Sequence, residues 1–328
     1  MSFQNNPHSF HIPVLGLCYT IDTPVKVAHY GISSVISLVD DISMEKMREF
    51  YCKKFNLPFQ SISTQTDDHR AKRITAYLNT VQEIVKQKFD HLKESFSNTE
   101  EEVQKYISML PDMSEIKLKF NQMIKTGEMK QKLSDWLKEN LVAGEIDVNI
   151  MSKLDRDNFE GGEKLPSIYS DAQSALRGFA LSDLSSSLVL SAGMNPRLYS
   201  YLEEFEDFYP NAGMELRKKV ILKVSDYRSA LIQGRFLAKK GIWVSEYRVE
   251  SGLNCGGHAF ATDGFLLGPV LEEFKNNKEQ LIDTVHEIYV KALAEKGKPV
   301  PEKPFLAKIT AQGGVGSNTE HEFLLNYF

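Results

Sequence analysis

Residues 247–264, Y-R-V-E-S-G-L-N-C-G-G-H-A-F-A-T-D-G, change from a strand pattern to a glycine-rich turn within a few positions. Apolar residues alternate at the start of the stretch, which favours a strand that ends where the glycines begin. Asn254, Cys255 and His258 therefore fall at the carboxyl end of that strand. In α/β proteins this end of the strands is where ligands bind. We expect the rest of the chain to bring other strand ends to the same edge.

Similar apolar runs recur along the chain, and a helical pattern follows each of them. The seven expected strands cover residues 11–20, 33–39, 145–151, 185–192, 218–224, 242–250 and 305–310. Such regular alternation predicts a parallel α/β protein, either a barrel or a doubly wound sheet. We expect a (β/α)8 TIM-barrel type that lacks its last β/α unit in this chain, because no eighth strand follows. Either the chain is a fragment of a longer protein or the barrel closes in another way.

Residues 43–144 differ from their surroundings, because they are charged, favour helix and contain few glycines or prolines. Within them, residues 70–96 carry apolar side chains at helical spacing, which predicts one long amphipathic helix. Thr99 and Glu102 form a capping-box pattern for the next helix. The expected organisation is barrel strands 1 and 2 in residues 1–42, a large helical insertion between strands 2 and 3 in residues 43–144, and barrel strands 3 to 7 in residues 145–328.

Composition limits the classes of partner. A hydrophobic content of 42% and a charged content of 25% indicate a globular protein, and the net charge of -5 provides no basic excess for nucleic acid. Cys18, Cys52 and Cys255 are too scattered for a disulfide framework or a zinc site, which favours the cytoplasm. No apolar run has transmembrane length, and the N-terminus lacks a signal-peptide pattern. We expect a small-molecule substrate and no nucleic-acid or membrane partner; homo-oligomer formation stays open.

Two kinds of feature suggest a binding site near the strand ends. Residues 312–316, Q-G-G-V-G, follow the last expected strand, and glycine N–H groups at such a turn can bind phosphate, although a tight turn is the default explanation. Asn149 and Lys223 lie in apolar strands, where a polar group needs a hydrogen-bond partner or a ligand. Glu250, together with Glu246 and Arg248, is either a polar position of the barrel interior or half of an ion pair.

His258 is the candidate for proton transfer. It follows Gly256 and Gly257, which let a ligand approach the backbone, and histidine can take a proton near neutral pH. A lone histidine is more often structural than catalytic. The position of His258 after the end of a strand is what favours a catalytic role. Cys255 has no activating neighbour in the pattern and is better explained by packing.

Four segments together resemble the nitronate monooxygenase family of FMN-dependent TIM barrels. I-P-V-L-G-L at 12–17 resembles the family's opening strand, and D-V-N-I-M at 147–151 resembles its G-V-N-L segment. E-S-G-L-N-C-G-G-H-A at 250–259 resembles its A-G-G-H motif, and A-Q-G-G-V-G at 311–316 resembles its A-x-G-G-I-x phosphate loop. The segments occur in the family's order and span most of the barrel. The helical insertion and the missing phosphate segment of strand eight depart from the family's pattern.

The resemblance implies an FMN-dependent oxidoreductase that acts on a small nitronate- or carbonyl-type substrate. His258 would remove the proton next to the nitro or carbonyl group, and dioxygen would reoxidise the flavin. No metal is expected, and the expected cofactor-binding residues are Asn149, Lys223, Glu250, Gly256, Gly257, Gly313, Gly314 and Gly316. Two alternatives stay open: a flavin-free TIM-barrel enzyme that binds a phosphorylated substrate, as aldolases and isomerases do, and a non-catalytic barrel that serves as a binding module.

Overall fold

A computed structural model divides the chain into two compact units. The first unit comprises Met1–Asn149 and Leu181–Ser186, and the second comprises Ile150–Ala180 and Ser187–Phe328. The structure describes residues 7–8, 10–14, 20–38, 40–95, 101–127, 130–150, 155–191, 193–250, 267–313 and 315–328.

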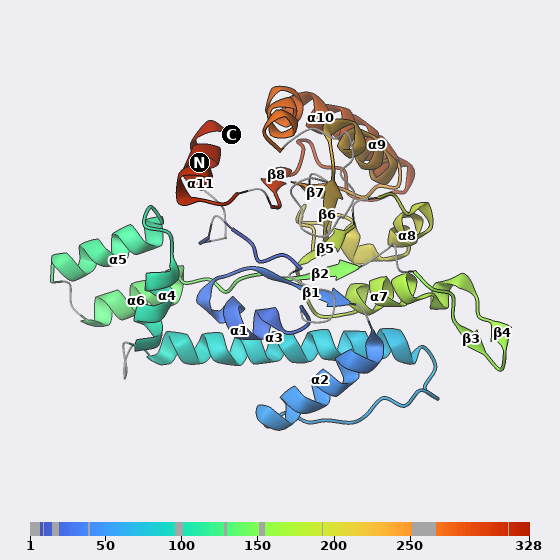
Figure 1. The fold of residues 1–328 in the computed structure, drawn as a ribbon, viewed down its shortest axis with the longest axis horizontal. Coiled ribbons are helices and arrows are strands. Elements are labelled where there is room, and N and C mark those ends of the chain that lie inside the picture. Colours follow the sequence, from blue (N-terminus) through green and yellow to red (C-terminus); the bar gives the residue numbers. More distant parts are fainter. Residues whose placement is uncertain are drawn as a thin grey trace. The chain divides into compact units, whose positions relative to one another are not determined.

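Six strands form the main sheet, in the order β1-β2-β5-β6-β7-β8 (Figure 1). They are β1 (Ser34–Leu38), β2 (Ile146–Ile150), β5 (Ser187–Leu190), β6 (Lys219–Val224), β7 (Val244–Val249) and β8 (Lys308–Ala311). The pairs β5–β6, β6–β7 and β7–β8 are parallel. The order in the sheet follows the order in the chain, as in a (β/α)8 barrel and unlike a doubly wound sheet, whose order reverses at a switch point. The parallel α/β class is therefore confirmed, whereas closure into a barrel stays a prediction.

Two regions differ from the strands expected from sequence. Of the first expected strand, residues 11–20, Ile12 forms a parallel bridge with Ser34, and residues 15–19 lie outside the described residues. Residues 159–164, which contain no expected strand, form an antiparallel hairpin of β3 (Phe159–Glu160) and β4 (Glu163–Lys164). Gly161 and Gly162 make its turn with φ angles of 58° and 86°. A two-residue hairpin turn with positive φ at both positions favours two glycines, so this hairpin had a readable signal.

The first unit is mainly helical. The helix expected for residues 70–96 is confirmed as α3, and its apolar stripe from Ala71 to Val85 is buried. The helices of this unit are α1 (Thr23–Val27), the 3-10 turn η1 (Ala28–Tyr30), α2 (Asp41–Lys54), α3 (His69–Ser95), α4 (Glu101–Met109), α5 (Glu115–Lys125) and α6 (Lys130–Asn140). Thr99, expected to cap α4, lies outside the described residues.

Helices α4, α5 and α6 form a cluster beside one end of α3 (Figure 1). Their apolar faces enclose a core to which η1 contributes Tyr30 and α3 contributes Leu92. The other members of this core are Val103, Tyr106, Ile107, Leu110, Phe120, Met123, Leu133, Leu137 and Leu141. Because the cluster shares a core with η1 and α3, buried apolar contacts join it to the rest of the first unit.

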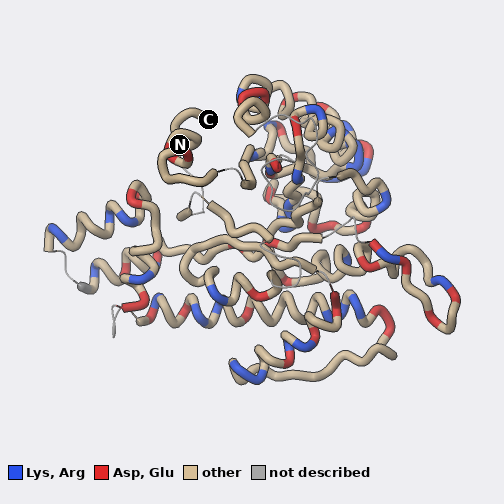
Figure 2. Tube along the Cα trace, viewed as in Figure 1, with Lys and Arg blue, Asp and Glu red and all other residues tan. Residues whose placement is uncertain are grey.

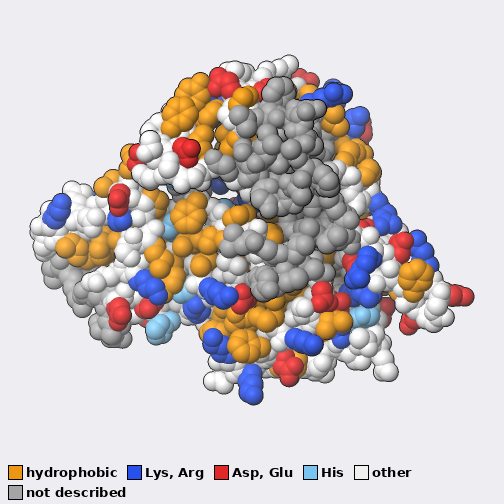
Figure 3. Space-filling model, viewed as in Figure 1, with side chains coloured by type: hydrophobic (Ala, Val, Ile, Leu, Met, Phe, Trp, Pro, Cys, Tyr) orange, Lys and Arg blue, Asp and Glu red, His pale blue; other side chains and the backbone are white. Residues whose placement is uncertain are grey.

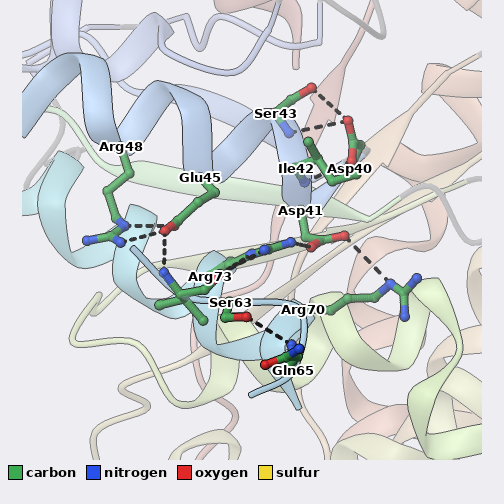
Figure 4. A network of polar contacts seen from close by, with 11 residues as sticks. Asp40, Asp41, Ile42, Ser43, Glu45, Arg48, Ser63, Gln65, Arg70 and Arg73 are labelled. Atoms are coloured by element: carbon green, nitrogen blue, oxygen red, sulfur yellow. Dashed lines mark hydrogen bonds and ion pairs between the residues drawn. The ribbon is translucent and has the colours of Figure 1, made fainter. Parts of the chain in front are cut away.

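Two arginines hold the loop between α2 and α3 (Figure 4). Arg48 donates to Glu45 at 2.7 and 2.9 Å and to the Gln60 carbonyl at 2.7 Å. Arg73 donates to Asp41 at 2.7 Å and to the Ile62 carbonyl at 2.7 and 2.9 Å. Both guanidinium groups are nearly buried and each is paired with a carboxylate, so the network is satisfied internally and fastens a long connection.

The second unit contains β5 to β8 and the helices that connect them. α9 packs on β6 and β7, and α10 packs on β7 and β8. Its helices are η3 (Ser167–Tyr169), α7 (Asp171–Ala180), α8 (Pro196–Tyr201), η4 (Leu202–Glu204), η5 (Glu206–Phe208), α9 (Tyr227–Ala238), α10 (Leu267–Glu295) and α11 (Asn318–Tyr327).

Charges are intermixed over both units. Figure 2 shows Lys and Arg interspersed with Asp and Glu along the helices. On the face drawn in Figure 3, the described residues likewise show acidic and basic side chains scattered among exposed hydrophobic ones. The absence of a nucleic-acid partner stays a prediction. Across the described ranges, no helix combines the length and the apolar composition needed to cross a membrane.

Gly144 provides a test of the packing in the first unit. Its N–H donates to the Ala28 carbonyl at 2.7 Å, and a methyl group on it would overlap the backbone of Ile32. We predict that Gly144→Ala lowers the free energy of unfolding by about 2–3 kcal/mol, because backbone atoms cannot move aside as a side chain can. Urea unfolding measures the effect. Gly268→Ala is the control, since a methyl group there meets open space. An unchanged urea midpoint for Gly144→Ala would contradict this packing.

His29 should make the stability depend on pH. The side chain is 5% exposed and lies against the Tyr30 ring, and burial, reinforced by Lys88, lowers its pKa from 6.5 to about 4. The unfolded state therefore binds more protons than the folded state between these values. Stability is full above pH 6.5 and falls as the pH drops towards 4, by at most about 1.4 kcal/mol per pH unit.

We predict that His29→Phe removes this part of the pH dependence, measured as urea midpoints at pH 7 and pH 4.5. His91→Gln, on an exposed position of α3, is the control and should behave as the wild type. If the wild type and His29→Phe lose the same stability between the two pH values, His29 is not the group that titrates.

Candidate functional site

One face of β6, β7 and β8 is polar, and the register of the strands explains why. A methyl group on Gly234 of α9 would contact the Tyr247 hydroxyl, so Tyr247 faces the helices. Side chains alternate along a strand, so the residues on either side of Tyr247 face the other way. Register places Lys223 beside Arg248, and Arg248 beside Thr310. We call the face opposite the helices the polar face; its polar members are Lys223, Glu246, Arg248, Glu250, Lys308, Thr310 and Gln312.

The structure brings together two of the expected cofactor-binding residues. Lys223 Nζ lies 3.3 Å from Glu250 Oε2, and Gln312 Nε2 donates to Glu250 Oε1 at 2.9 Å. The side chains of Lys223 and Glu250 are only 13% and 12% exposed. Of the two explanations for Glu250 that the sequence left open, the ion pair is the one observed, with Lys223 as its partner.

A second ion pair lies on the same face, nearer the start of β7. Arg248 Nε donates to Glu246 Oε1 at 2.8 Å, and the Thr310 hydroxyl donates to the same oxygen. The side chains of Arg248 and Glu246 are 6% and 12% exposed. Nearly buried charged groups lose favourable hydration, and the attraction within an ion pair only partly compensates for this loss. Apolar residues at the same positions would make the folded state more stable. A face that keeps four such charges suits the binding of a polar ligand.

Asn149, on β2 in the first unit, is the most incompletely bonded polar side chain of the expected site. It is 1% exposed, and within the described part of the chain neither Oδ1 nor Nδ2 has a hydrogen-bond partner. Asp147, two residues earlier and therefore on the same face of β2, pairs with His11 Nε2 at 2.9 Å. A buried amide without partners costs about 1–3 kcal/mol, so Asn149 is suited to contact a ligand or water.

The glycine-rich turn offers less to an anion than its sequence predicts. Gly313 has a φ angle of 84°, a conformation that favours glycine. The N–H groups of Gly316 and Ser317 donate to Glu320 Oε2 at 2.8 and 3.0 Å, completing a capping box at the start of α11. These two bonds lower the pKa of Glu320. The chain's own carboxylate therefore holds the N–H group of Gly316 that the phosphate interpretation requires.

The remaining expected residues cannot be placed. His258, Gly256, Gly257 and Gly314 lie outside the described residues, as do Asn254 and Cys255. Their roles stay predictions. No group of three or more His, Cys, Asp or Glu side chains that could hold a metal is present in the described ranges.

Sequence reasoning did not find three members of the site. Thr310 and Gln312 join the polar face through strand register, and His11 reaches Asp147 from another segment of the first unit. The sequence did contain a signal for Thr310 and Gln312. Polar residues occupy every second position at 308, 310 and 312, as they do at 246, 248 and 250. Glu320 was also readable, since Ser317 and Glu320 form the S-x-x-E capping pattern.

Comparison with known proteins adds no relative. No protein-family model matches the chain, and searches of curated proteins and of solved structures found no match either. The relationship to nitronate monooxygenases therefore stays a prediction based on four sequence segments.

The Lys223–Glu250 pair can be tested through stability. We predict that Glu250→Gln lowers the free energy of unfolding by about 2 kcal/mol, because Lys223 then lacks a carboxylate in a poorly hydrated place. Adding Lys223→Met should restore most of the loss, which a double-mutant cycle in urea measures. Glu206→Gln is the matched control, since Glu206 pairs with Lys298 but is 81% exposed, and it should change stability by less than about 0.5 kcal/mol. Equal effects of Glu250→Gln and Glu206→Gln would show that the polar face is well hydrated.

Proposed function

We propose that the chain is an FMN-dependent oxidoreductase of the nitronate monooxygenase type that acts on a small nitronate- or carbonyl-type substrate. The observation that carries the proposal is the buried amide of Asn149, whose donor and acceptor both lack partners among the described residues. Asn149 also stands where the D-V-N-I-M segment resembles the family's flavin-contacting segment. A carboxamide can donate one hydrogen bond to the imide edge of a flavin ring and accept another from it.

The two ends of a flavin fit this chain unequally. Asn149 fits the ring, because a ligand would satisfy both of its buried polar atoms. Gly316 does not fit the phosphate, because its N–H already donates to Glu320. The proposal therefore assigns phosphate contact to Gly313 and Gly314 alone. The same observation weakens the alternative of a flavin-free enzyme for a phosphorylated substrate, since that alternative depends on this loop.

The other residues receive their roles from chemistry and resemblance. Bound FMN supplies two-electron redox chemistry, with dioxygen as the oxidant. His258 is proposed to take the proton next to the nitro or carbonyl group, while Gly256 and Gly257 allow the substrate to approach the backbone. Lys223 and Glu250 are proposed to line the site, where each balances the charge of the other. The proposed location is the cytoplasm.

Asn149→Leu separates a flavin-binding role from a packing role. In a fluorescence titration of FMN with the full chain, we predict that this substitution weakens binding at least tenfold, the equivalent of about 1.4 kcal/mol. Without FMN, the same variant should be more stable in urea, because an unsatisfied buried amide is removed.

Asn121→Leu makes the same chemical change on an exposed position of α5, and it should leave both quantities unchanged. A wild-type chain that does not bind FMN would refute the proposed function. A wild-type chain that binds FMN no more tightly than Asn149→Leu would remove Asn149 from the site.

A further inference from the structure

We infer that the polar face of β6, β7 and β8 binds a small carboxylate through the guanidinium group of Arg248. This goes beyond the proposed function, because anion binding at Arg248 needs no flavin. All of the residues involved belong to the second unit.

The hydrogen bonds of Arg248 leave most of its donors available. Its side chain is 6% exposed, and within the described residues its hydrogen bond is the one from Nε to Glu246 at 2.8 Å. A guanidinium group carries five N–H donors, four of them on Nη1 and Nη2. Nη1 and Nη2 are not among the buried side-chain atoms that lack a partner, so water or a ligand can reach them. Two parallel bonds to a carboxylate would occupy two of their four donors.

The residues beside Arg248 on the adjoining strands are polar. Its neighbours Tyr247 and Val249 are on the side of the helices, so Arg248 is on the opposite face. Lys223 and Thr310 lie beside it on the two adjoining strands. A second cation thus lies beside Arg248, and Lys223 can donate to an oxyanion while it stays paired with Glu250. The Thr310 hydroxyl already donates to Glu246.

The charge of the polar face fits one negative charge. Among the described residues, Lys223, Arg248 and Lys308 contribute +3, and Glu246 and Glu250 contribute −2, which leaves +1. The four nearly buried charges balance, and the excess comes from Lys308, which is exposed. A monoanion neutralises this balance, whereas a phosphate dianion would exceed it. The planar fork of arginine also matches the two coplanar oxygens of a carboxylate. The charge and the geometry point to the same class of ligand.

The test uses the full chain and sodium propionate in a saturation-transfer NMR titration, with propionamide as the neutral analogue. We expect propionate to bind and propionamide to bind at least tenfold more weakly. Arg248→Gln should lower the affinity for propionate at least tenfold, and Arg248→Lys should lie between, because it keeps the charge and loses the fork. Arg235→Gln, an exposed arginine on α9, should bind as the wild type does.

A second pair of variants guards against misfolding of Arg248→Gln. Glu246→Gln removes the carboxylate that competes for Arg248, so it should bind propionate several-fold more tightly. The double variant Arg248→Gln with Glu246→Gln leaves neither charge unpaired, so it should fold and lose binding. Equal binding of propionate and propionamide, or unchanged affinity in the double variant, would overturn the inference. Measurement with and without FMN separates the two proposals, since loss of flavin binding would leave the propionate result intact.

Discussion

The parallel register between β6 and β7 is the constraint on which the second unit depends. It places Leu222 beside Tyr247 under the helices and Lys223 beside Arg248 on the other face. A shift by one residue would exchange the two faces, moving charges under α9 and apolar side chains to the polar side. The same backbone hydrogen bonds therefore maintain both the apolar core and the arrangement of charges, and neither can change without the other.

This arrangement explains why ion pairs occur where apolar packing would be cheaper. Glu246 and Glu250 each hold a cation in place, and Thr310 and Gln312 hold the two carboxylates from β8 and the residue that follows it. A cation fixed in this way needs little reorganisation to receive a ligand. Asn149 in the first unit has no hydrogen-bond partner among the residues that the structure describes, and there too a polar ligand would satisfy the side chain. Ligand binding is proposed at both places because burying a polar or charged group costs free energy that a ligand can offset.

Local patterns in the sequence were enough to predict much of the fold. The periodicity of α3 and the apolar runs of β1, β2, β5, β6 and β7 depend on neighbours in the chain and were readable. The pairing of Lys223 with Glu250 was not, because it depends on which residues of two strands lie opposite each other. The bond from the Gly316 N–H to Glu320 was missed for a different reason: the glycine pattern was considered without the carboxylate four residues later. Sequence thus identified the residue types of the site better than it identified their partners.

The polar face is proposed to use its charges to hold a ligand. A crystal structure of the full chain grown with propionate tests it most directly. The account predicts density for the carboxylate within hydrogen-bond distance of Arg248 Nη1 and Nη2, with the Lys223–Glu250 pair retained. A structure in which both Nη groups are bonded to acceptors of the chain itself, with no propionate on this face, would contradict it.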